Sequence, residues 1–133
     1  MIDQNDERIQ KIADFYGWES QGQQCIEETA ELTKAINKFY RFQNYPELSV
    51  DDDEAYDEVK EGLLDDIVQE ISDVEICIAQ LKYLIENYFM YSGKPYTNVK
   101  IQRELRRIDK FTKKALEAKA AFMEDEYNDE KRV

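Results

Sequence analysis

Two pairs of acidic residues, each spaced by three positions, are the groups in this sequence best suited to chemistry. Glu28 and Glu31 form an E-x-x-E pair, and Glu70 and Asp73 form an E-x-x-D pair, each within a run of apolar residues with helical periodicity. At about 100° per residue, Glu28 lies about 80° and Glu70 about 60° from the centre of its helix's apolar stripe, and each partner lies further round on the same shoulder. If the two helices pack antiparallel with these shoulders facing, the four carboxylates converge at the edge of the core.

Four carboxylates so close together repel one another unless a cation lies between them. Oxygen ligands suit a hard cation, Mg²⁺ or Mn²⁺, which keeps several waters and accepts substrate phosphates. The competing interpretation is that these acids are merely solvated, because a chain with 30 acidic residues carries many such spacings. The pairing of two motifs on the shoulders of two apolar helices is less common on solvated faces, so the geometry leaves both interpretations open.

The composition predicts a single all-α domain spanning residues 1–133. The chain is 42% hydrophobic, yet it contains only four glycines and two prolines, fewer than strands and turns require. It has no histidine, which excludes histidine-based acid–base catalysis and histidine-ligated zinc. Cys25 and Cys77 lie within apolar helical patterns and are expected to be buried free thiols.

The formal net charge of −12 bears on the possible partners. Such an acidic surface repels phosphate backbones and anionic lipids, so neither nucleic acid nor a membrane is expected as a general partner. A nucleotide enzyme would need a divalent cation, or a local cluster of Lys and Arg, to reverse the field at its site. The N-terminal sequence lacks a signal peptide and no run of 18 apolar residues occurs, which predicts a cytoplasmic protein.

Hydrophobic periodicity predicts a bundle of four to five helices with its core in about residues 15–124. A short helix over about 5–15 ends at Gly17, and a long helix follows over about 20–42, with Ile26, Ile36 and Tyr40 in its apolar stripe. An acidic connection over 41–60 contains a short helix starting near Asp53. The second motif lies on a long helix over about 62–91, whose seam runs from Ile67 to Ile85. A last helix covers about 98–124, and residues 125–133 are expected to fray.

The segments QQCIEETAELTKAINKFYR and LLDDIVQEISDVEICIAQL resemble the MazG-like family of all-α nucleoside triphosphate pyrophosphohydrolases. That family carries an E-x-x-E motif on one helix and an E-x-x-D motif on the next, and the resemblance covers roughly residues 15–110. It implies cleavage between the α- and β-phosphates, giving a nucleoside monophosphate and pyrophosphate. The 38 residues between Glu31 and Glu70 exceed the usual spacing, so 41–60 is interpreted as an insertion.

The resemblance also implies roles for individual residues. Glu28, Glu31, Glu70 and Asp73 become ligands of Mg²⁺, with one or two metals, and Glu27 or Glu31 activates the attacking water. Because the substrate is anionic, Lys34, Lys38 and Arg103 are the basic residues expected to reach the β- and γ-phosphates. Gln24, one turn before Glu28, is expected to read a base edge or the ribose.

Two alternatives remain open at this point. Within the resemblance, the enzyme could be selective for dUTP or dCTP instead of acting generally on nucleotides. From another class, the chain could be a helical scaffold without activity, assembled through its apolar seam. Either way, long amphipathic helices in so short a chain predict a homodimer or homotetramer.

Overall fold

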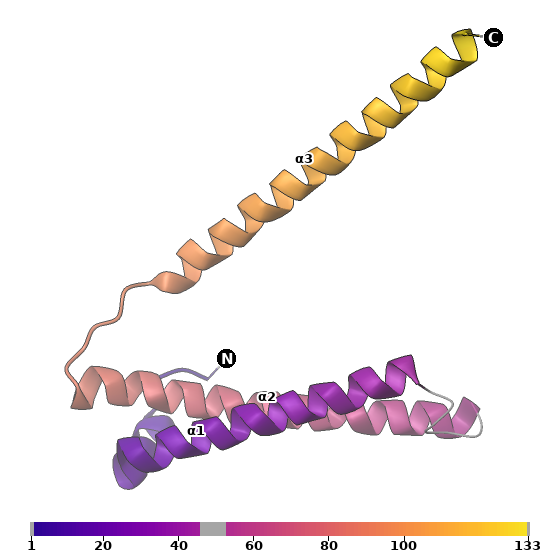
Figure 1. The fold of residues 1–133 in the computed structure, drawn as a ribbon. Helices are drawn as coiled ribbons and strands as arrows, with labels where there is room; N and C mark the ends of the chain where they lie inside the picture. Colours follow the sequence, from indigo (N-terminus) through magenta and orange to yellow (C-terminus); the bar gives the residue numbers. More distant parts are fainter. Residues whose placement is uncertain (1, 46–52, 133) are drawn as a thin grey trace. The chain divides into compact units, whose positions relative to one another are not determined.

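The structure is a computed structural model that describes residues 2–45 and 53–132, and these residues form three helices. They are α1 (Glu7–Asn44), α2 (Asp53–Tyr88) and α3 (Tyr96–Lys131) (Figure 1). The predicted all-α class is confirmed for this part of the chain. None of the three helices combines the length and apolar composition that a bilayer crossing requires.

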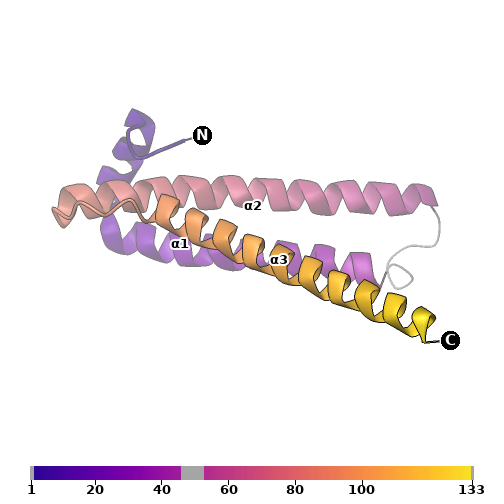
Figure 2. The ribbon, with the colours of Figure 1, turned by 90° about the horizontal axis from the view of Figure 1, so that it is seen from above.

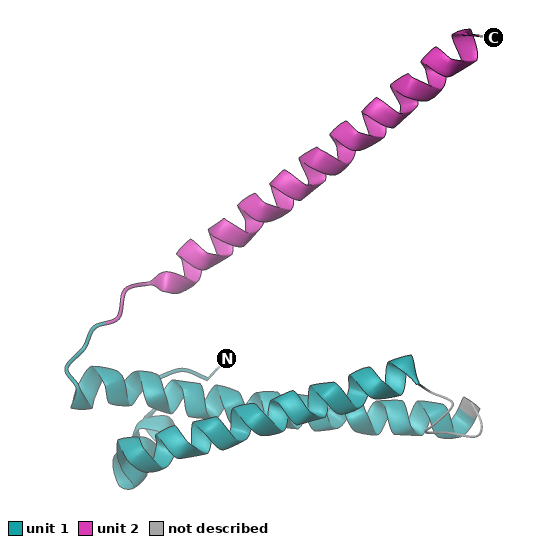
Figure 3. Cartoon of the chain, in the orientation of Figure 1, with its two compact units in different colours: residues 1–92 teal, residues 93–133 magenta. Residues whose placement is uncertain are grey.

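The chain divides into two compact units, residues 1–92 and residues 93–133 (Figure 3). Unit 1 contains α1 and α2, which lie side by side and antiparallel. Unit 2 contains α3. The two units are described separately below, and both acidic motifs belong to unit 1.

A kink at Gly17 divides α1 into two segments, as the sequence predicts. Gly17 has φ 82° and ψ 176°, a conformation that side-chain-bearing residues essentially never adopt. The kink lets the two segments contact α2 from different sides, so that α2 lies between them (Figure 2). The segment before the kink is held on α2 by Tyr83 Oη, which donates to the carboxylate of Asp14 at 2.9 and 3.0 Å. In the segment after the kink, Gln21 donates a hydrogen bond to Gln80 of α2.

The long segment of α1 and α2 meet along a seam with alternating steps of three and four residues, the spacing of antiparallel helix packing. The phenyl ring of Phe42 stacks on that of Tyr56 at the far end of this seam, with centroids 4.7 Å apart. No residue of the seam is exposed, and its members are Gln21, Cys25, Glu28, Leu32, Ala35, Phe39 and Phe42 on α1 and Leu63, Ile67, Glu70, Val74, Cys77, Leu81 and Leu84 on α2. Two motif glutamates therefore lie within the seam itself.

The seam differs from the predicted apolar stripes in position. The sequence places Ile26, Ile36 and Tyr40 in the core, but Ile26 is 71% and Tyr40 is 62% exposed, and Ile36 is also exposed. The apolar surface of α1 is wider than one neighbouring helix can cover, and α2 covers only one side of it. The face of α1 that contacts α2 is therefore rotated about the helix axis from the predicted one. This rotation explains why Glu28, expected on a shoulder, lies in the seam.

The number and ends of the helices also differ from the expected ones. The described part of the chain holds three helices, because α1 spans both predicted helices of 5–15 and 20–42 across its kink, and the predicted short helix near Asp53 and the long helix from about 62 form one continuous α2. Gly62 weakens a helix by only about 1 kcal/mol relative to alanine and does not end it. The helix α3 continues to Lys131 instead of ending near 124, and the Lys131 ammonium lies 4.6 Å from the ring centroid of Tyr127 in its last turn. Part of the predicted 41–60 connection, residues 46–52, lies outside the described residues.

Candidate metal centre

Three of the four predicted ligands come together where the two motif helices meet. Glu28 on α1 and Glu70 and Asp73 on α2 each offer a carboxylate oxygen, and these oxygens lie within 4.8 Å of one another. Glu28 and Glu70 are half-buried, whereas Asp73 is exposed, so the cluster opens from the seam to one face of the helix pair. We refer to Glu28, Glu70 and Asp73 as the acidic triad.

Glu70 has the most unusual environment in the triad. Its Oε2 atom is buried and has no hydrogen-bond partner among the described residues. Burial raises the pKa of the Glu70 carboxyl, and the charges of Asp73, Glu28, Glu31 and Asp66 raise it further. All of these effects disfavour the carboxylate form of Glu70, and none of them comes from a positive charge that would stabilise it.

The sequence places Glu28 and Glu70 on helix shoulders, but the structure places them at seam positions normally filled by apolar side chains. A buried acceptor without a partner costs free energy unless something donates to it or coordinates it. The seam therefore contains a polar defect at the point where the two motifs meet.

Gln24 is positioned by the triad itself. Its Nε2 donates to Glu28 Oε1 at 2.5 Å, one helical turn away on the same side of α1. This hydrogen bond ties the Glu28 carboxylate to the preceding turn of α1. The predicted contact of Gln24 with a base or ribose would require this amide to serve two partners or to exchange them.

Glu31, the fourth predicted ligand, is exposed and does not belong to the acidic triad. It nevertheless lies near enough for its charge to raise the pKa of Glu70. Glu27 is also exposed, and its position on α1 points it away from the seam. Of the two acids predicted to activate water, Glu31 is thus the one beside the triad.

The predicted phosphate-binding residues lie in both units. Lys34 and Lys38 are exposed and follow Glu31 by three and seven residues, so they continue its strip along α1. Both residues therefore lie on the same side of the helix as Glu31. Arg103 belongs to α3 in unit 2, so its predicted role stays a prediction from the sequence.

Several neighbours of the triad were not identified as site residues from the sequence. Asp66, one turn before Glu70, adds negative charge to the site. Cys77, one turn after Asp73, is a buried free thiol as predicted, and its burial, followed by the charges of Cys25, Glu28 and Asp73, raises its pKa to about 11. The i±4 spacing from the motif could have indicated both residues. Cys77 stays protonated at neutral pH and is a poor nucleophile.

The triad has the features of a site for a hard divalent cation. It offers only carboxylate oxygens, it leaves one of them buried without a partner, and the charges of Glu28 and Asp73 raise the pKa of Glu70. A bound Mg²⁺ would lie against Glu28, Glu70 and Asp73, since these are the oxygens that converge. The donor set therefore fits the predicted cation.

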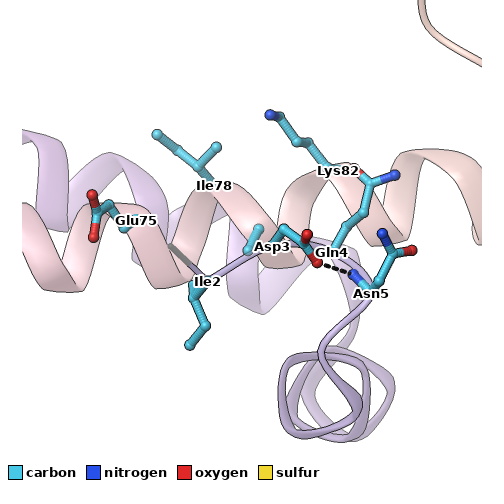
Figure 4. Close-up of a pocket in the computed structure, with 8 residues that line it drawn as sticks. Ile2, Asp3, Gln4, Asn5, Glu75, Ile78 and Lys82 are labelled. Atoms are coloured by element: carbon cyan, nitrogen blue, oxygen red, sulfur yellow. Dashed lines mark hydrogen bonds between the residues drawn. The ribbon is translucent and has the colours of Figure 1, made fainter.

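A cavity elsewhere in unit 1 does not bring predicted site residues together. Its volume is about 320 Å³, and it lies between the N-terminal segment Ile2–Asn5 and α2 (Figure 4). Ile78 and Lys82 line the side of the cavity that α2 forms. On the opposite side, within the N-terminal segment, Asn5 N donates to Asp3 Oδ1 at 2.8 Å. On α2, Ile78 lies about 80° round the axis and about 12 Å along it from Glu70, and Lys82 lies about 120° round and about 18 Å along, so this cavity is separate from the triad.

Comparisons of the chain with models of protein families, with curated proteins and with solved structures found no match. The resemblance to MazG-like enzymes therefore depends on the two motifs alone.

Proposed function

We propose that the chain is a Mg²⁺-dependent hydrolase that converts (deoxy)nucleoside triphosphates into nucleoside monophosphates and pyrophosphate. One observation carries this proposal. The E-x-x-E and E-x-x-D motifs, 38 residues apart in sequence, bring three carboxylates within 4.8 Å and leave one oxygen buried without a partner. Solvated acids on a scaffold helix need neither this convergence nor this burial.

Individual residues have the following roles in the proposed reaction. Glu28, Glu70 and Asp73 bind the cation, and Gln24 holds the Glu28 carboxylate in place. When bound, Mg²⁺ neutralises phosphate charge and polarises the phosphoryl oxygens. Glu31 is the carboxylate placed to accept a proton from a water beside the triad, because it is exposed yet electrostatically coupled to Glu70.

The anionic substrate requires positive charge close to an acidic triad. Lys34 and Lys38 supply it along the strip of α1 that begins at Glu31, so a triphosphate chain would extend from the triad toward the Phe42 end of the helix pair. Arg103 is proposed to add a third contact. Selectivity for dUTP or dCTP is an outcome of the substrate panel.

We also propose that the protein is a homodimer or homotetramer. The exposed apolar side chains of α1, Ile26, Ile36 and Tyr40, support this. Light scattering after size-exclusion chromatography gives the mass directly, and a monomer at micromolar concentration would contradict the proposal.

The decisive experiment measures cation binding and hydrolysis separately. Mg²⁺ is expected to raise the melting temperature of the parent protein, by an amount equivalent to about 2.7 kcal/mol at a hundred times Kd. In Mg²⁺, a panel of NTPs and dNTPs is expected to yield pyrophosphate and not inorganic phosphate. Glu70→Gln and Asp73→Asn should abolish both the Mg²⁺-induced shift and pyrophosphate release.

Glu61→Gln is the matched control, because it removes the same charge from an exposed position on the same helix. It should leave both readouts unchanged. If no nucleotide yields pyrophosphate while the Mg²⁺ shift persists, the triad is a metal site without this activity. If Mg²⁺ gives no shift and Glu70→Gln behaves like the parent, the scaffold interpretation replaces the enzymatic one.

A further inference from the structure

The helix α3, taken by itself, has two chemically distinct faces. An apolar stripe runs along one side, with Ile101, Leu105 and Ile108 at steps of three and four residues. Seven basic residues of the same stretch lie within about 70° of a common direction on the opposite side. We call these seven the basic face: Lys100, Arg103, Arg106, Arg107, Lys110, Lys113 and Lys114.

The basic face is a local reversal of the chain's charge. Residues 100–114 contain only two acids, Glu104 and Asp109, so the segment has an excess of five positive charges in a chain of net charge −12. Among the described residues, Arg107 alone of the seven is in an ion pair, with Glu104 at 2.6 Å, and both side chains are more than half exposed. Such an exposed pair neutralises little of the field.

The distribution of charge around α3 disfavours a membrane as the partner. A helix lying on an anionic bilayer inserts its apolar stripe, and Lys and Arg at the edges of that stripe reach the headgroups. On α3, by contrast, Glu104 and Asp109 lie at these edges, within about 80° of the stripe's centre. Inserting the stripe would press two carboxylates against the headgroups and point the basic face into water.

The same face fits a regular array of phosphates. Residues 100–114 span about 21 Å at 1.5 Å per residue, and successive basic residues lie one or three residues apart, about 1.5 or 4.5 Å along the axis. Tyr96 is in line with this face one turn before Lys100, but no aromatic residue of 100–114 lies between the basic residues on this face, whereas proteins that bind single strands stack successive bases on a series of aromatic rings. The major groove of B-form DNA admits an α-helix, whereas the deep, narrow major groove of A-form RNA does not.

We propose that the basic face of α3 binds the phosphate backbone of duplex DNA without sequence preference. The net charge disfavours nucleic acid over the surface as a whole, and the basic face is the local exception. Lys and Arg contacts to phosphates release counterions, so the binding is strongly salt-dependent. With five of the seven residues on phosphates, the slope of log K against log salt is about −4.5. Affinity then falls about 20-fold between 50 and 100 mM salt.

Fluorescence anisotropy with a labelled 20-base-pair DNA duplex of mixed sequence tests the proposal on the full chain. The parent should bind at 50 mM salt with this dependence, and an unrelated duplex sequence should bind equally. The variant Arg107→Glu, Lys110→Glu, Lys114→Glu should bind at least tenfold more weakly. It leaves Arg103 in place, so pyrophosphate release should be unaffected and the two proposals are tested separately.

The matched control reverses three basic residues of unit 1: Lys11→Glu, Lys60→Glu, Lys82→Glu. It changes the net charge equally but leaves α3 intact, so binding should stay within about threefold of the parent, because distant charges are screened at this salt. The glutamine version of the α3 triple, with circular dichroism matching the parent, should give an intermediate loss and shows that unfolding is not the cause.

Three results would overturn the proposal. They are absence of binding to the duplex at 50 mM salt, equal losses in the α3 and control triples, and binding to phosphatidylglycerol vesicles without binding to DNA.

Discussion

The kink at Gly17 gives the sharpest test of how α1 is built. With φ 82° and ψ 176°, Gly17 occupies a region that costs an L-residue about 1–3 kcal/mol. A Cβ added at Gly17 meets no heavy atom within 4 Å, so Gly17→Ala creates strain without a collision. The loss of stability therefore measures the backbone conformation alone.

Gly22 provides a matched control within the same helix. It is helical, its φ is not positive, and a Cβ there also meets nothing within 4 Å. Both substitutions lower the entropy of the unfolded chain equally. The difference between the two variants therefore isolates the strain, and it is expected to be about 1–3 kcal/mol, with Gly22→Ala more stable than the parent by up to about 1 kcal/mol.

Urea unfolding followed by tryptophan fluorescence measures this difference. Trp18 is the chain's single tryptophan, adjoins the kink, and packs edge-to-face on Phe89 with ring centroids 5.1 Å apart. With a slope of about 1–3 kcal/mol per molar urea, the two midpoints should be separated by roughly 1 M. Equal midpoints for the two alanine variants would refute the assignment of the kink to a glycine-only conformation.

Three further predictions concern the helix pair. Glu70→Gln should stabilise the metal-free protein at neutral pH relative to the parent. Because the pKa of Glu70 is raised in the folded state, the stability that its carboxyl contributes is fully present below the ordinary glutamate pKa of 4.5 and is lost as pH rises through the folded-state pKa. Gln21→Leu should cost about 1–3 kcal/mol in urea unfolding, because it leaves the Gln80 amide buried without its partner, and adding Gln80→Leu should recover most of this loss. Tyr83→Phe should lower the melting temperature by removing the hydrogen bonds that hold the Asp14 segment on α2.

Each of these has an outcome that contradicts it. If the melting temperatures of Glu70→Gln and the parent change in parallel from pH 4 to 8, the ionisation of Glu70 does not affect the stability of the folded protein. A double leucine variant as unstable as Gln21→Leu alone would argue against the amide pair. For Tyr83, the control is Tyr40→Phe, an exposed tyrosine of α1, and equal effects of both substitutions would show that the hydroxyl of Tyr83 contributes nothing.

The sequence alone predicted the elements that depend on local chemistry. The all-α class follows from helical periodicity with few glycines and prolines, and the break at Gly17 follows from the conformations that only glycine adopts. The burial of Cys25 and Cys77 followed from their positions in apolar helical patterns. Each of these properties is decided within a few residues of chain.

The sequence could not predict how far helices extend across weak breakers. The helix α2 continues through Gly62, and α3 continues to Lys131. A glycine or a polar tail lowers helix stability by an amount that neighbouring turns can offset, so the end of a helix is a sum over many residues.

The acidic site shows the same division. The two motif spacings identified Glu28, Glu70 and Asp73, because acids three residues apart share one side of a helix. Only the packing of α1 on α2 decided that Glu28 and Glu70 lie in the seam while Glu31 stays exposed. Both helices have apolar surfaces wider than one partner covers, so the sequence left their rotation about the axis undetermined. That rotation buries Glu70 Oε2 without a hydrogen-bond partner and makes the triad a candidate metal centre.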